Sequence, residues 1–346
     1  MISFARIDLN DMPWENLREF KGANIFHTRP WIEFLADYER AEPVIATVQS
    51  GNQTQGYFTG LIFNKIGLRI LGSPYNGWDT FFMGFNLKPG VSYHEVLQAF
   101  PRFVFNDLKC HFLMIIDSNL EGDELKGLSY NVRKTINYAL DLTKTEAELF
   151  ANMKGNNCRR AIRGAEKKGV VIEETADPGF ADEYFAQHQE LLVRKSSPPD
   201  FRLDFVRQMI TRLLPTGNLL LLRARNPEGD CIATHIDLVF NKVAVYWGGA
   251  SWQQYFNLHP NELIYWYAIK RAKAMGAEML RLGSTLKQFK EKFGAYETHG
   301  FVLRQAKNPI YYFLAILFTS FTVRMRDWIF YKFGRRLHPE LRRRAK

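Results

Sequence analysis

A histidine and an aspartate two residues apart, His235 and Asp237, lie within an otherwise apolar run, IATHIDLVF, at residues 232–240. Side chains at i and i+2 point to the same face of a β-strand, so the two polar groups face the same way. Burying them without partners is costly, so they must be hydrogen-bonded, solvated in a cleft or used in chemistry. An imidazole beside a carboxylate can act as a general base that takes a proton from an attacking amine. The alternative is a hydrogen-bonded pair that holds neighbouring loops.

Basic side chains form two further groups that could bind phosphate. Arg159 and Arg163 are four residues apart in RRAIRGAEKKGV, so a helix would place them on one face. Arg194 and Lys195 precede Ser-Ser-Pro-Pro, where we expect a helix to give way to a loop, and loop residues often contact ligands. Guanidinium groups bind phosphate oxygens in a bidentate manner. A solvated basic helix surface explains the first pair equally well.

The segment at residues 259–294 provides elements that would position these groups. Pro260 suits the first turn of a helix, because its missing N–H has no partner there in any case. An apolar stripe that includes Tyr267 follows at helical spacing, and Gly276 ends the helix. Residues 278–283 are short and mostly apolar. The segment therefore predicts a loop, a helix, a buried strand, a loop and a second short helix.

The two halves of the chain share an outline. The tripeptide FNK at residues 63–65 recurs at 240–242, an offset of 240 − 63 = 177. The same offset places the helix expected at residues 26–38 on residues 203–215. The expected strand at residues 44–48 falls on residues 221–225, LLRAR. This shared order of helix, strand and hairpin predicts two copies of one α/β unit.

We therefore expect an α/β (α+β) fold with two tandem domains and a C-terminal amphipathic helical tail. Polar and acidic residues after the strand CHFLMIID mark the seam. Thr145 and Glu148 have the spacing of a capping box for a long helix that runs to Lys168. The predicted domains are residues 1–140, 141–306 and 307–346.

Composition restricts the class of protein. A chain of 346 residues with 46% hydrophobic content can form two packed domains. Its three scattered cysteines indicate neither a disulfide framework nor a metal site. The N-terminal run MISFARIDLNDMPW has acidic residues where a signal peptide has a basic region and an apolar run. We therefore expect a cytoplasmic protein without a bound metal.

The formal net charge of +10 is concentrated at the C-terminus. Residues 301–346 contain 11 Lys and Arg against two acidic residues, which gives 11 − 2 = +9. The apolar run that begins at Ile310 has about 14 residues, and a membrane-spanning helix needs about 20. This pattern predicts an amphipathic helix that lies in an anionic membrane surface. A helix docked on the protein itself is the alternative.

The C-terminal half resembles a known family. The pattern AxxxG…LxLG…FKxxFG, preceded by YWGGAS at residues 246–251, resembles the FemAB-type, GNAT-like acyltransferases. RRAIRGAEKKGV and HQELLVRKSSPPDF extend the resemblance, which covers roughly residues 26–300. This family includes peptidoglycan-bridge aminoacyltransferases and N-acyltransferases of envelope-polymer and lipid pathways. The resemblance implies two tandem GNAT-like domains and transfer of an acyl group to an amine.

The resemblance also implies roles for individual residues. Phe289 and Lys290 occupy the family's FK motif, whose lysine faces donor or acceptor phosphate. Arg194 aligns with a basic residue that contacts acceptor phosphates in Fem enzymes. In GNAT folds the strand that contains Tyr246 offers a backbone N–H to the acyl carbonyl, and Tyr246 could protonate a leaving thiolate. An ordinary aromatic core residue is the alternative for Tyr246.

Two departures from the family pattern bear on substrates. The loop QQYFNLH at residues 253–259 lacks the glycines that cradle the CoA pyrophosphate in GNAT enzymes. Arg281 stands where many members have an aspartate. We expect a membrane-peripheral N-acyltransferase that uses acyl-CoA and an amine of an envelope sugar, peptide or lipid precursor. A charged tRNA as donor, and a non-catalytic lipid-binding protein, are the alternatives; DNA is not an expected partner.

Overall fold

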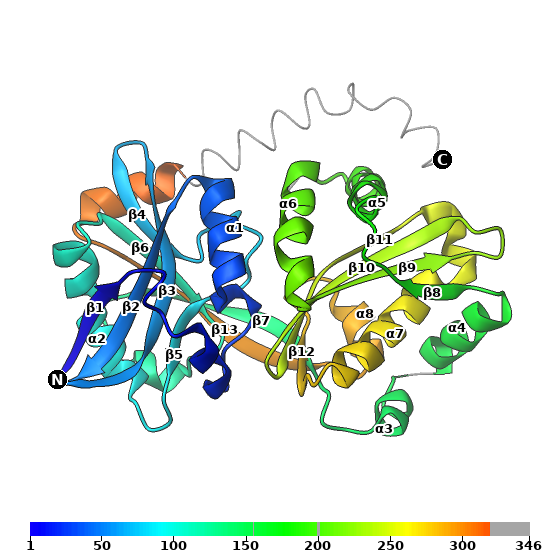
Figure 1. Ribbon diagram of the computed structural model, residues 1–346, viewed down its shortest axis with the longest axis horizontal. Helices are drawn as coiled ribbons and strands as arrows, with labels where there is room; N and C mark the ends of the chain where they lie inside the picture. The colour runs from blue at the N-terminus through cyan, green and yellow to red at the C-terminus, as the bar shows by residue number, and fades with distance from the viewer. Residues whose placement is uncertain (155, 199–200, 319–346) are drawn as a thin grey trace. The chain divides into compact units, whose positions relative to one another are not determined.

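The computed structural model describes residues 1–154, 156–198 and 201–318. The chain forms two compact units (Figure 1). Unit 1 contains Met1–Ile136 and the described chain from Thr298 onward, and unit 2 contains Asn137–Glu297. The chain passes between the units within strands β7 (Asn131–Asp141) and β13 (Tyr296–Ala306). The division expected from the sequence, with boundaries after residues 140 and 306, stays a prediction.

Unit 1 is built on a sheet with the strand order β1-β2-β3-β4-β6-β13, with β5 beside β3. Neighbouring strands are antiparallel except β4 and β6, which are parallel. Its other strands are β1 (Ile2–Ile7), β2 (Glu42–Ser50), β3 (Gln53–Lys65), β4 (Leu68–Ser73), β5 (Gly84–Leu87) and β6 (Phe112–Asp117). Its helices are α1 (Arg29–Glu39) and α2 (Tyr93–Arg102), with short turns η1 (Trp14–Glu19), η2 (Ile25–His27), η3 (Phe103–Asp107) and η4 (Gly122–Leu125).

Unit 2 is built on a sheet with the strand order β7-β12-β11-β10-β9-β8. The β11–β12 pair is parallel and the others are antiparallel. Its strands after β7 are β8 (Val171–Glu174), β9 (Leu219–Arg225), β10 (Cys231–Phe240), β11 (Val243–Ser251) and β12 (Met279–Arg281). Its helices are α3 (Glu146–Ala151), α4 (Asn156–Lys167), α5 (Phe180–Arg194), α6 (Leu203–Leu213), α7 (Pro260–Ala274) and α8 (Lys287–Lys292), with η5 (Leu214–Thr216) and η6 (Gln253–Leu258).

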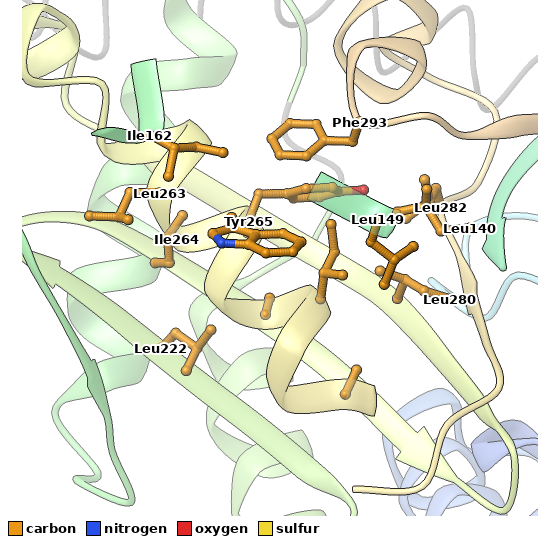
Figure 2. Packing of buried hydrophobic residues seen from close by; sticks show 14 of the residues in the cluster. Leu140, Leu149, Ile162, Leu222, Leu263, Ile264, Tyr265, Leu280, Leu282 and Phe293 are labelled. Carbon is orange, nitrogen blue, oxygen red and sulfur yellow. The ribbon is translucent and has the colours of Figure 1, made fainter. Parts of the chain in front are cut away.

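Helices α5 and α7 cover opposite faces of strand β10. Thr234 donates its hydroxyl hydrogen to Oε1 of Gln187 on α5, at 2.8 Å. The ring of the next residue, His235, lies 5.7 Å from the ring of Tyr265 on α7. Because adjacent strand residues face opposite sides, the two helices lie on different faces. Figure 2 shows Leu263, Ile264 and Tyr265 of α7 within the apolar core of unit 2.

The expected mixed α/β class and the repeat are confirmed, with one correction. The order α1–β2–β3–β4 in unit 1 recurs as α6–β9–β10–β11 in unit 2. The predicted long helix from Thr145 to Lys168 is wrong, because α3 ends at Ala151 and a separate helix, α4, begins at Asn156. The sequence between the two helices, NMKG, contains Asn and Gly, which have low helix propensity. Thr145 does form the expected capping box with Glu148, which stabilises α3.

The predicted tail lies mostly outside the described residues, which end at 318. Residues 309–318 are helical, and they expose the apolar side chains of Ile310, Phe313 and Leu317. Within the part of the chain that the structure describes, no helix is both long enough and apolar enough to cross a membrane.

Candidate active site

A cavity of about 190 Å³ lies in unit 2 beside strands β10 and β11, the end of α5 and the beginning of α7. Its wall is largely apolar and aromatic and contains a few polar groups, as is common for small-molecule sites. Five of the nine predicted site residues line it: His235, Tyr246, Arg194, Lys195 and Phe289. The structure therefore brings together residues from three separate stretches of the sequence.

His235 lies in the wall of this cavity and pairs with the buried Asp237, which does not line it. His235 Nε2 and Asp237 Oδ1 are 2.8 Å apart, and both side chains are buried. With the Nε2 hydrogen donated to the carboxylate, Nδ1 keeps a lone pair that can accept a proton. The second carboxylate oxygen of Asp237, Oδ2, is buried and has no hydrogen-bond partner among the described residues. The pair thus has the hydrogen bond that orients an imidazole as a base.

A β-bulge lies next to the pair. His235 is opposite Gly249, whereas Asp237 is opposite Tyr246, so β11 contains one more residue than β10 over this interval. Bulges re-aim side chains and leave backbone groups outside the ladder, and they are frequent next to active sites. The strand that the family resemblance linked to binding of the acyl carbonyl is therefore irregular at Tyr246.

Two tyrosines surround the imidazole. Ring centroids are 5.0 Å apart for His235 and Tyr246 and 5.6 Å apart for Tyr246 and Tyr265. Burial, followed by the charge of Asp237, raises the pKa of Tyr246 above its usual value. Burial likewise raises the pKa of Tyr265, with smaller effects of Tyr246 and Asp237. Both hydroxyls therefore stay protonated at neutral pH and can donate hydrogen bonds.

Tyr265 is a cavity residue that the sequence pattern does not single out, because helical spacing favours Tyr267 for the apolar stripe. Tyr265 lines the cavity, and its ring lies 5.3 Å from Phe289 and 4.6 Å from Phe293. Tyr267 instead donates its hydroxyl hydrogen to Glu174 Oε1, at 3.0 Å. Helix α7 is buried around most of its circumference, so helical spacing does not single out one inward face. The aromatic run YWY at residues 265–267 was the available signal.

Arg194 and Lys195 stand at the end of α5, as expected from the sequence. The Arg194 guanidinium lies 4.8 Å from the centroid of the Phe256 ring, and its Nη1 is 3.7 Å from Glu190 Oε1. Glu190 also accepts a hydrogen bond from the backbone N–H of Gln253, at 2.8 Å. Nη1 is buried and has no hydrogen-bond partner among the described residues. The guanidinium thus retains a donor that could bind an anion.

Lys290 is buried outside the cavity wall, although its neighbour Phe289 lines the cavity. Its Nζ donates to the backbone oxygen of Gly283, at 3.0 Å, and lies 5.9 Å from the centroid of the Tyr138 ring. Burial lowers the pKa of Lys290 to about 8. Successive residues of a helix point in directions about 100° apart, so the side chains of Phe289 and Lys290 lie in different environments. A phosphate contact by Lys290 stays a prediction.

Arg159 and Arg163 on α4 lie apart from the residues that line the cavity. Arg159 Nη1 donates to the backbone oxygen of Ala151, at 2.7 Å. The Arg163 guanidinium lies 5.5 Å from the centroid of the Phe150 ring. These contacts join α4 to α3, and a substrate-binding role for the two arginines stays a prediction.

The first turn of α7 reaches the cavity through Asn261. The first backbone N–H groups of a helix have no intrahelical partner and favour anions. The preceding QQYFNLH segment forms the 3-10 helix η6, and its Phe256 also lines the cavity. Among the described residues, no three His, Cys, Asp or Glu side chains converge as a metal site would require.

Known proteins share a domain family or a fold with this chain. Residues 153–291 match the family model of the acetyltransferase (GNAT) domain. The fold is similar to that of FemX, with a TM-score of 0.71 and 14% identity, covering 86% of this chain and 96% of FemX. L-PGS from Bacillus licheniformis is similar with a TM-score of 0.56 and 13% identity, covering 90% and 96% of the two chains. A tandem GNAT protein from the clavulanic acid biosynthesis pathway has a TM-score of 0.50 and 11% identity, covering 89% and 99%.

Unit 2 therefore contains a GNAT domain, and the chain as a whole has a tandem GNAT-like fold. The GNAT domain match and the similarity in fold to FemX and L-PGS confirm the resemblance to the FemAB-type, GNAT-like acyltransferases that the sequence motifs carry. No curated protein sequence matches this chain.

Proposed function

We propose that this protein is an N-acyltransferase that moves an acyl group from acyl-CoA to an amine of a cell-envelope sugar, peptide or lipid precursor. The buried His235–Asp237 pair, whose histidine lines a cavity of the GNAT unit, carries this proposal. Catalytic groups are commonly polar residues that converge in an otherwise apolar pocket.

In the proposed reaction the amine nitrogen attacks the carbonyl carbon of the thioester. An N–C bond forms, the C–S bond breaks, and the proton of the amine passes to His235 Nδ1. Asp237 holds the imidazole in orientation and stabilises the imidazolium. The thiolate leaves and takes up a proton, for which the Tyr246 hydroxyl is the proposed donor. Holding both reactants together supplies a further part of the rate.

The cavity also offers contacts for an anionic acceptor. Arg194 and Lys195 lie at the end of α5, and Phe289 provides an aromatic wall. Phosphate groups of a nucleotide-linked or lipid-linked acceptor would pair with the two cations. Lys290, Arg159 and Arg163 do not line this cavity, so a role for them requires a ligand that extends beyond it.

We place the protein in the cytoplasm, peripheral to the inner face of the cytoplasmic membrane. The exposed Ile310, Phe313 and Leu317 recur at helical spacing, and the net charge of residues 301–346 is +9. Apolar side chains with nearby cations favour anionic lipid surfaces. We expect the protein to float with vesicles that contain anionic phospholipid and to remain unbound with neutral vesicles. A triple serine variant at the three positions should bind more weakly, and equal binding would contradict the assignment.

Mass spectrometry of the product tests the reaction. The purified protein is incubated with envelope and lipid extract and a mixed acyl-CoA pool, alongside Asp237→Asn as the inactive variant and Tyr267→Phe as the control. We expect an N-acylated product with wild type and the control, and much less with Asp237→Asn. If a product forms only when charged tRNA replaces acyl-CoA, the donor is an aminoacyl-tRNA. If neither donor gives a product, a non-catalytic lipid-binding role replaces the proposal.

A further inference from the structure

The hydroxyl group of Tyr265 is buried without a visible partner. The residue is 3% exposed, and its hydroxyl has no hydrogen-bond partner among the described residues. The aromatic rings nearest to the Tyr265 ring are those of Phe293, Phe289 and Tyr246. A buried hydroxyl without a partner costs free energy, so this position is unfavourable unless something else compensates.

Two other tyrosines of this protein donate their hydroxyl hydrogens to backbone oxygens. The buried Tyr130 donates to the backbone oxygen of Leu97, at 2.9 Å. Tyr93 donates to the backbone oxygen of Phe85, at 3.2 Å. Buried tyrosines generally find such partners. Tyr265 differs from both and lines the cavity that contains His235, which indicates that its partner arrives with a ligand.

We propose that the Tyr265 hydroxyl donates a hydrogen bond to the carbonyl oxygen of the acyl group and stabilises the oxyanion formed during transfer. This inference rests on the proposed N-acyltransferase function. When the amine nitrogen bonds to the carbonyl carbon, the π electron pair moves to the carbonyl oxygen, which the Tyr265 O–H then holds. The pair returns as the C–S bond breaks and the thiolate leaves. His235 receives the proton of the amine, and Tyr265 keeps its own.

The surroundings of Tyr265 suit this role. Its ring packs against Phe289 and Phe293, which also contact each other, so the donor needs little reorganisation during the reaction. A fixed donor in a water-poor site stabilises developing charge more strongly than it would in water. Its position on α7, opposite the bulged segment of β11, would add a side-chain donor to a backbone N–H of that strand.

The test compares Tyr265→Phe with Tyr267→Phe, which removes a hydroxyl two residues away on the same helix. With acetyl-CoA and the acceptor found in the extract, we expect kcat of Tyr265→Phe to fall about 10²- to 10³-fold with little change in KM. The Tm of the unliganded Tyr265→Phe protein should be unchanged or higher, because no hydrogen bond is lost. Tyr267→Phe should keep its kcat and lose a small amount of Tm.

Unchanged kcat in Tyr265→Phe would overturn the inference, and so would a lowered Tm of its unliganded form, which would reveal an internal partner. If wild type yields no acylated product, the proposed function fails, and acetyl-CoA then serves as a binding probe. A Tm increase by acetyl-CoA in wild type that Tyr265→Phe loses would support the hydroxyl contact without the reaction. Equal Tm increases in both proteins, or none in wild type, would also contradict the contact between acetyl-CoA and the Tyr265 hydroxyl.

Discussion

Units 1 and 2 repeat one order of elements, but they use the equivalent central strand differently. At the offset of 177, His235 corresponds to Phe58 (235 − 177 = 58) and Asp237 to Gly60 (237 − 177 = 60). Phe58 is fully buried, and its ring centroid lies 4.6 Å from that of Phe100. The fold therefore forms without a polar pair at this place, so the pair in unit 2 is not a requirement of the fold.

Glycines at equivalent positions of the two units, in contrast to the polar pair, are needed in both. A Cβ added at Gly249 would lie 2.8 Å from the hydroxyl oxygen of Tyr246. At the equivalent position of unit 1, a Cβ on Gly72 (249 − 177 = 72) would lie 2.7 Å from Cβ of Tyr75. Both units need a residue without a side chain there. The comparison thus separates what the fold requires from what the chemistry requires.

The largest effect that we expect concerns the pair itself. His235→Asn should lower kcat by roughly 10²- to 10⁴-fold because the base is lost, whereas Phe58→Leu in unit 1 should leave kcat within about twofold. Steady-state assays of the N-acylated product measure both variants. Equal losses in the two variants would show that the two strands do not differ in the way proposed.

The next prediction concerns the stability of unit 1 and not the activity of unit 2. Phe58→Ala should lower the free energy of unfolding by about 3–5 kcal/mol, because a buried aromatic side chain is replaced by a cavity. Urea unfolding followed by fluorescence measures this change, with Phe58→Leu as a milder control that should cost less than about 1.5 kcal/mol. A negligible loss for Phe58→Ala would mean that Phe58 is not a core residue.

A third prediction concerns the buried ammonium group of Lys290 in unit 2. Because the pKa of Lys290 is lowered to about 8 from 10.5, the unfolded chain binds more protons than the folded chain between these two values. Stability should therefore rise with pH from about 8 to 10.5, by roughly 1–3 kcal/mol, and this contribution should be constant below pH 7. In Lys290→Met the rise should disappear. A rise of the same size in both proteins would locate the titrating group elsewhere.

The smallest effect concerns binding at the end of α5. Arg194→Gln should raise KM for a phosphate-bearing acceptor about tenfold and change kcat less, because a charge-assisted contact contributes on the order of 1–2 kcal/mol. Arg207→Gln is the matched control, since Arg207 is exposed and pairs with Asp182 at 2.6 Å. The same KM for both variants would exclude Arg194 from acceptor binding.

Local patterns predicted much of this fold. Alternation identified the strand that carries His235, and Pro260 marked the first residue of α7. The tripeptide repeat identified the doubled unit, since β2 and β9 begin at equivalent positions after the offset (219 − 177 = 42). These features depend on residues close in sequence, for which spacing and turn chemistry are informative.

Features set by tertiary packing could not be predicted in the same way. Spacing could not distinguish Tyr265 from Tyr267, because α7 is surrounded by protein on most sides. The direction of the Lys290 ammonium depends on the backbone oxygen of Gly283, which only the folded chain brings near. The short cation–aromatic contact of Arg194 likewise depends on Phe256, which is distant in sequence.

The return of the chain to unit 1 through β13 has a consequence for synthesis on the ribosome. Strand β6 pairs with β13, and the partners Asp117 and Phe301 are 301 − 117 = 184 residues apart. At about 5–20 residues per second, the edge of β6 stays unpaired for roughly 10–40 s, until β13 is synthesised. An open strand edge can pair with another chain, so the nascent unit 1 is exposed to aggregation until β13 has been synthesised.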